Sequence, residues 1–189
     1  MSWLKGFFDT ESPYSTGDSP PELASELIEA EAMASEIGDY LLGDRLFRQI
    51  VVETPLGTRR PKMTLGSLWE RILHLQAATD LGPRDQERLS VVENVWKSAK
   101  SIYPDQFKRK LRRELDSYLK NWRYYLDQRA QDPDRWDADY PAELRNRQRV
   151  GLVLSLLGSD APHGLMDDLE SFERDYGVDT SDERISNDI

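Results

Sequence analysis

The chain lacks cysteine and has only two histidines, His74 and His163, among its 189 residues. The absence of cysteine excludes disulfides, zinc–thiolate sites, iron–sulfur clusters and a cysteine nucleophile, and it fits a reducing compartment. Each histidine has an acidic residue four positions away, Glu70 and Asp167 respectively. A metal site needs three or four ligands, and no HExxH motif accompanies either pair. The sequence therefore predicts neither a metal site nor another cofactor.

Long apolar segments are also missing. The longest, Val150 to Leu157, has eight residues and includes a serine, whereas a transmembrane helix needs roughly 20 residues. The apolar stretch before Asp9 is too short for a signal peptide and carries one lysine. We therefore expect a cytoplasmic protein without a transmembrane segment.

The motifs of common enzyme families are absent as well. The eleven glycines are scattered, and neither of the phosphate-binding patterns GxxxxGK[ST] and GxGxxG occurs. The GxSxG turn that positions a serine nucleophile is missing too. These absences favour a non-enzymatic protein, and they leave open an active site that uses carboxylates alone.

Charge divides the chain into three parts, although its formal net charge is -10. The net charge is -8 over residues 1–58, +6 over 59–158 and -8 over 159–189. A segment rich in serine, proline and acidic residues precedes residue 22, and the chain ends in a polar acidic stretch. Such compositions are typical of linkers and disordered tails. The sequence predicts an N-terminal aromatic peptide and flexible linker (1–21), a helical domain (22–176) and an acidic disordered tail (177–189).

Apolar residues recur every three to four positions across the central part, which predicts a mainly α-helical fold. The capping-box spacing of Ser19 and Glu22 predicts that the first helix begins at Ser19. Gly38 then ends or bends this helix, and a short second helix is expected over 39–48. Further helices are expected over 64–79, 83–101, 104–130, 141–158 and 164–176.

One segment carries a β pattern. Residues 49–54 are rich in β-branched side chains, residues 54–57 (TPLG) have a turn composition, and residues 58–63 provide a return strand. The alternative is a helix that continues to Val52, followed by a loop. We therefore expect a single-domain bundle of six to seven helices with a small β-hairpin insert near residues 49–63.

Basic residues cluster on two successive predicted helices, over residues 97–123. Basic side chains contact nucleic-acid phosphates, but acidic neighbours such as Glu114 and Asp116 dilute this face, and both acidic ends of the chain would repel a polyanion. A nucleic-acid-binding regulator is therefore the alternative function. The residues of this possible anion-binding face are Lys108, Arg109, Arg112, Arg113, Lys120 and Arg123.

The N-terminal peptide contains an aromatic cluster, Trp3, Leu4, Phe7 and Phe8, ahead of the linker. Exposed clusters of this kind often mark interaction sites. The cluster would dock on a partner, fold back on the domain or touch a membrane surface, and its single lysine makes the last option the weakest. The main hypothesis is a protein-protein interaction or scaffold module that binds another protein.

Overall fold

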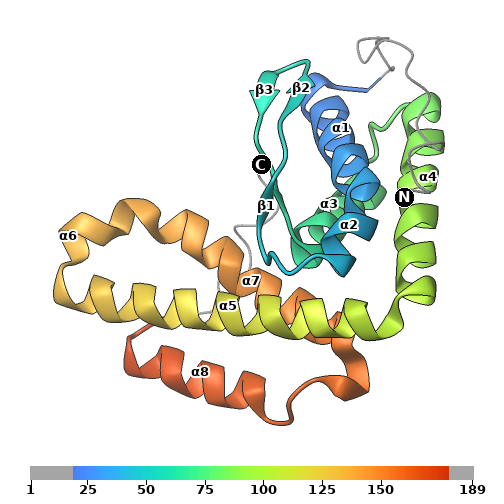
Figure 1. The fold of residues 1–189 in the computed structure, drawn as a ribbon. Coiled ribbons are helices and arrows are strands. Elements are labelled where there is room, and N and C mark those ends of the chain that lie inside the picture. The colour runs from blue at the N-terminus through green and yellow to red at the C-terminus, as the bar shows by residue number, and fades with distance from the viewer. Residues whose placement is uncertain (1–18, 179–189) are drawn as a thin grey trace.

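The computed structural model describes residues 19–178, and these form a mainly helical domain with a small antiparallel hairpin (Figure 1). The predicted aromatic cluster of Trp3, Leu4, Phe7 and Phe8 lies outside the described residues, as does most of the predicted acidic tail. In chain order the elements are α1 (Pro21–Ser35), α2 (Ile37–Leu42), β1 (Arg48–Gln49), β2 (Val52–Thr54), β3 (Gly57–Arg59), β4 (Lys62–Met63), α3 (Leu65–Ala77), α4 (Pro83–Ile102), α5 (Pro104–Gln131), α6 (Pro133–Trp136), η1 (Asp137–Asp139), α7 (Tyr140–Leu157), η2 (Gly158–Asp160) and α8 (Leu165–Asp175).

The longest helix, α5, is the base on which the other elements assemble. It spans 28 residues, or about 40 Å at 1.5 Å per residue. Helix α7 packs along it, and α8 runs on its other side (Figure 1). Most of the apolar residues of this helix form one stripe that is buried in full. It comprises Phe107, Leu111, Leu115, Tyr118, Leu119, Trp122, Tyr125 and Leu126.

Three aromatic rings in contact connect α3 and α4 to α5. Trp69 of α3 stacks on Trp96 of α4 with ring centroids 5.2 Å apart, and Trp96 meets Phe107 of α5 edge to face at 5.0 Å. Helix α1 packs against both α3 and α4. Such ring contacts add to the stabilisation from burial, so one continuous core runs from α1 to α5.

The hairpin insert forms as predicted, and the alternative of a helix continuing to Val52 is wrong. Strand β2 pairs with β3, and β1 pairs with β4 in the same hairpin. Between the two pairs the Ile50 N–H donates to the carbonyl oxygen of Pro61 at 3.0 Å. Gly57 has a φ of +92° at the turn, a backbone conformation that residues with a side chain rarely adopt. Strand β2 packs on α1 and places the hairpin alongside that helix (Figure 1).

Several helix boundaries differ from the sequence-based expectation. Helix α1 ends at Ser35 and α2 begins at Ile37, so Gly38 lies inside α2 and neither ends nor bends α1. Helix α1 begins at Pro21, and the Ser19 hydroxyl accepts a hydrogen bond from the Gly82 N–H at 2.9 Å instead of capping α1. Helix α2 ends at Leu42 rather than near residue 48. The carbonyl oxygens of Arg45 and Asp44 accept hydrogen bonds from the side chains of Lys110 and Arg113 on α5, respectively. These contacts replace the backbone hydrogen bonds of a continued helix. No helix among residues 19–178 is both long and apolar enough to span a bilayer.

Candidate functional site

A buried carboxylate lies where α5 meets the start of α3. Glu114 is 0% exposed. One of its oxygens accepts hydrogen bonds from the Leu65 N–H and the Tyr40 hydroxyl, each at 2.7 Å, and the other accepts from the Gly66 N–H at 2.9 Å. The first N–H groups of a helix have no partner within the helix. Glu114 therefore caps α3 from a neighbouring helix.

The surroundings of Glu114 oppose its ionisation. Burial raises the pKa of Glu114 to about 7, although its three hydrogen-bond donors act in the opposite direction. Burial, together with the Glu114 charge, also raises the pKa of the Tyr40 hydroxyl. Lys110 lies close by, with its Nζ 4.4 Å from the centroid of the Tyr40 ring. Because Glu114 has no exposed surface, we assign it a structural role rather than contact with a substrate.

A polar cavity of about 280 Å³ lies next to this buried cluster. Two of its lining residues, Thr64 and Tyr118, share a hydrogen bond between their hydroxyls at 2.9 Å, and Thr64 directly precedes the Leu65 and Gly66 N–H groups that donate to Glu114. The cavity opens where the base of the hairpin, the start of α3 and the middle of α5 and α7 converge. We call it the basic cavity, and its walls are Phe47, Lys62, Thr64, Ser67, Arg71, Tyr118, Asn121, Asn146 and Arg149.

The charges on the basic cavity all have one sign. Arg71 pairs with Glu29 at 2.6 Å and Arg149 with Glu70 at 2.7 Å, but neither carboxylate belongs to the cavity wall. Lys62 is exposed and forms no ion pair with a described residue. Three cations and no acidic residue therefore face this space, in a chain whose net charge is -10.

A second buried ionic cluster attaches α8 to the bundle. Glu173 is 1% exposed and accepts two hydrogen bonds from the Arg147 guanidinium, at 2.9 and 3.0 Å. It also accepts one from the Trp122 indole N–H at 2.7 Å. Breaking a buried pair of this kind leaves an uncompensated charge, so this cluster fixes the position of the acidic helix α8.

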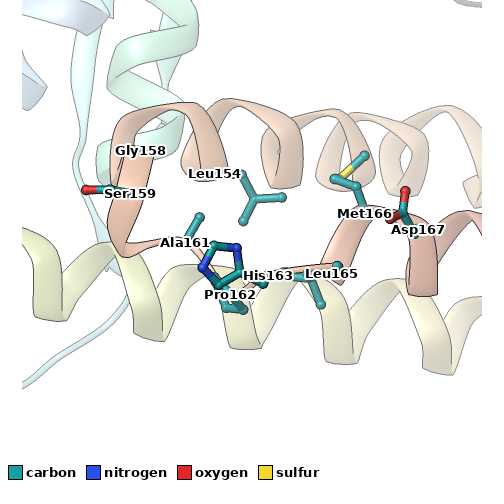
Figure 2. A pocket seen from close by; sticks show the side chains of 10 residues that line it. Leu154, Gly158, Ser159, Ala161, Pro162, His163, Leu165, Met166 and Asp167 are labelled. Carbon is teal, nitrogen blue, oxygen red and sulfur yellow. The ribbon is translucent and has the colours of Figure 1, made fainter.

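The two histidine–acid spacings of the sequence do not form pairs in the structure. His74 contacts Glu26 instead, and Glu70 pairs with Arg149. His163 precedes α8, whose N-cap is Gly164, so its spacing to Asp167 is not helical. Both side chains line a cavity of about 280 Å³ between α7 and α8, and Figure 2 shows the ring and the carboxylate well apart along its wall. Among the described residues no group of three or more metal-ligating side chains gathers.

The basic face predicted on α5 is partly used within the protein. Lys108 and Arg112 contact Asp160 at 2.6 and 3.6 Å. Arg113 donates to the carbonyl oxygen of Asp44 at 2.9 Å, and the Arg123 guanidinium lies 5.6 Å from the centroid of the Phe172 ring. Arg109 and Lys120 are exposed. Four of these six side chains would therefore have to give up an internal contact in order to bind a nucleic-acid phosphate.

Sequence reasoning missed both buried ionic clusters. It placed Glu114 on the exposed basic face, which is wrong because Glu114 is fully buried. A signal was present, because Glu114 follows Leu111 by three residues and precedes Tyr118 by four, the spacing of the buried stripe. Glu173 likewise follows the buried Leu169 by four residues. In both cases the sequence signal was an acidic residue three or four positions from apolar residues of a buried helix face.

Comparisons of the chain with models of protein families, with curated proteins and with solved structures gave no match.

Proposed function

We propose that this protein is a non-enzymatic module that binds an acidic segment of another protein through its hairpin insert. The observation that carries the proposal is a concentration of exposed apolar side chains. Of the seven large apolar side chains exposed among residues 19–178, four lie between residues 42 and 56. We call residues 42–63 the hairpin surface. The four side chains and their exposed fractions are Leu42 (59%), Phe47 (42%), Val51 (62%) and Leu56 (43%).

The charge of the hairpin surface indicates the chemistry of the partner. It carries five basic residues and two acidic ones, so its sign is opposite to that of the whole chain. Arg48 is paired with Glu36, whereas Arg59 and Arg60 are exposed on the hairpin. Opposite charges on two surfaces accelerate their association and select among partners. A partner segment with both acidic and apolar side chains fits this surface.

A cavity beside the hairpin surface adds a place for an anchoring side chain. It measures about 450 Å³ and is lined by Asp39, Tyr40, Gly43, Asp44, Arg45 and Arg48. Interfaces gain most of their binding energy from a few side chains inserted into such hollows. The aromatic cluster of Trp3, Leu4, Phe7 and Phe8 stays a prediction, as a second contact with the partner.

The test is affinity purification of the full chain followed by mass spectrometry. The Val51→Ser/Leu56→Ser variant removes two exposed side chains that line neither cavity near the hairpin. Ile102→Ser is the matched control, because Ile102 is 53% exposed at the far end of α4. We expect one partner to be recovered with the wild type and the control, and to be lost with the double variant at unchanged urea-unfolding stability.

Two results would overturn this assignment. Equal recovery of partners by the double variant would exclude the hairpin surface as the binding site. Loss of the partner on deletion of residues 1–14, with normal binding by the double variant, would transfer the interaction to the N-terminal peptide.

Nucleic-acid binding stays the alternative prediction, with less support because most of the predicted basic face is engaged internally. Filter binding at low and high salt tests it, because phosphate contacts make affinity fall steeply with salt. The Arg109→Glu/Lys120→Glu variant changes the two exposed members of that face without breaking an ion pair between described residues. Tight, salt-dependent binding by the wild type, lost in this variant, would favour the alternative.

A further inference from the structure

We propose that the basic cavity binds the phosphate group of a small phosphate monoester. The cavity differs from the hairpin surface in that its wall is almost entirely polar, with Phe47 as its single apolar side chain. Its cationic groups come from three elements, with Lys62 on β4, Arg71 on α3 and Arg149 on α7. This inference does not depend on the proposed protein partner.

The two arginines are held in place before any ligand arrives. Glu29 accepts two hydrogen bonds from the Arg71 guanidinium, whose Nη1 also donates to the Ser67 hydroxyl at 2.8 Å. Glu70 accepts a hydrogen bond from the Arg149 Nε at 2.8 Å. A guanidinium fixed in this way loses little rotamer entropy when it binds an anion. The ion pairs thus orient the arginines and reduce their net charge, and Lys62 supplies the uncompensated positive charge.

Hydroxyl and amide groups complete a set of hydrogen-bond donors. The Ser67 hydroxyl oxygen accepts from Arg71, which leaves its own proton to donate. The Thr64 and Tyr118 hydroxyls share one hydrogen bond, so one proton of that pair is also left. Burial and the nearby Glu114 raise the pKa of Tyr118, which keeps its phenol protonated at neutral pH. The exposed Asn121 contributes an amide at the cavity wall.

The size and charge of the cavity narrow the ligand class. Charge-assisted hydrogen bonds to phosphate are among the strongest in proteins. A cation would be repelled by the uncompensated charge of Lys62 and would meet no acidic ligand in the cavity wall. The volume of about 280 Å³ lies just below the range of typical ligand pockets, which begins near 300 Å³. This volume favours a small phosphate monoester over a nucleotide.

The experiment is isothermal titration of the full chain with phenyl phosphate, inorganic phosphate and acetate at constant ionic strength. Lys62→Gln removes the unpaired cation of the cavity. Arg60→Gln is the matched control, because it removes one exposed positive charge from the same hairpin outside the cavity wall. We expect phenyl phosphate to bind, Lys62→Gln to weaken its affinity at least about tenfold, and Arg60→Gln to change it by less than about twofold, since loss of one charged hydrogen bond costs about 1.5–3 kcal/mol.

Each contrary outcome overturns the proposal. Absence of binding at millimolar phenyl phosphate removes the site, and equal effects of the two substitutions reduce it to general surface charge. Equal affinity for acetate contradicts selection of phosphate. Binding of a phosphoserine peptide without binding of phenyl phosphate contradicts the small-molecule class. The Val51→Ser/Leu56→Ser variant should retain phosphate binding, which separates this result from that of the protein-partner test.

Discussion

The carboxylate of Glu114, in the middle of α5, accepts a hydrogen bond from the backbone N–H of Gly66 in the first turn of α3, at 2.9 Å inside the core. This contact joins a residue of α3 to a residue of α5 that lies 48 positions further along the chain. The contact also holds the first turn of α3 in place. Thr64 and Ser67, on either side of Gly66, line the basic cavity. One buried acid therefore couples the packing of the bundle to the geometry of the candidate site.

Replacement of Glu114 by alanine should destabilise the fold by at least about 3 kcal/mol. The substitution leaves the N–H groups of Leu65 and Gly66 and the hydroxyl of Tyr40 without their acceptor, and an unsatisfied buried polar group costs about 1–3 kcal/mol. Urea unfolding monitored by circular dichroism measures the change. Asp116→Ala is the control, since Asp116 is exposed on the same helix and such a site changes stability by about 0.5 kcal/mol or less. Similar losses for the two variants would contradict the capping role of Glu114.

The contribution of Glu114 to the stability of the protein should fall as pH rises from about 4.5 to about 7. Burial raises the pKa of Glu114 from its ordinary value of 4.5 to about 7 in the folded protein. Within this window the folded state binds more protons than the unfolded state, so the free energy of unfolding decreases with rising pH. The contribution of Glu114 is complete below about pH 4.5 and is lost once the pH passes the folded-state pKa.

Comparison with Glu114→Gln isolates this effect from the other titrating groups. Glutamine does not ionise, so the difference in unfolding free energy between wild type and variant should change across the window. Urea unfolding in half-unit pH steps from 4 to 8 measures it. A difference that stays constant with pH would show that Glu114 has the same pKa in the folded and unfolded states, against the raised pKa.

The Glu173→Ala substitution should release α8 while the rest of the bundle stays folded. It breaks the buried pair with Arg147 and the hydrogen bond from the Trp122 indole, and loss of one partner of a buried pair costs about 3–5 kcal/mol. Hydrogen exchange followed by mass spectrometry should show faster exchange over residues 165–175 and little change in α5. Glu170→Ala, at an exposed position of the same helix, should leave exchange unchanged. Unaltered protection in Glu173→Ala would mean that apolar contacts alone hold α8.

The helices were largely predictable because their information is local. The apolar spacing of α5 and the proline at the start of α4 each predict helix from residues that lie within about one turn of one another. The hairpin was predictable for the same reason, since a β-branched run over residues 49–54 precedes a Pro-Leu-Gly turn. Where prediction failed, the competing contact came from elsewhere in the chain. Ser19 binds the backbone before α4 rather than that of α1, and the sequence around Ser19 contains no sign of this partner.

The candidate site was not predictable, because its members have ordinary sequence surroundings. Lys62, Arg71 and Arg149 lie in three separate elements, and only the packing of these elements brings them to one cavity. The basic face expected on α5 was a local inference from charge, and it omitted Asp160, which lies in η2 after α7. Asp160 is 52 residues from Lys108, with which it pairs. A tertiary contact of this length has no local signature.

Two glycines in helices should respond in opposite ways to substitution by alanine. A Cβ on Gly66 would lie 3.2 Å from the Val153 Cγ2 and 3.4 Å from the Glu114 Oε2, so either the core or the carboxylate must shift. A Cβ on Gly151, within α7, would have no atom outside its own helix nearby, because nothing lies within 4 Å.

Alanine is favoured over glycine inside a helix by about 1 kcal/mol. Gly151→Ala should therefore stabilise the protein by up to that amount, whereas crowding should offset the same gain in Gly66→Ala and make it destabilising by about 1 kcal/mol. Thermal and urea unfolding of the two variants measures the difference. Equal stabilisation by both would mean that α3 and α5 can separate at no cost, which contradicts the close approach of Gly66 to Glu114.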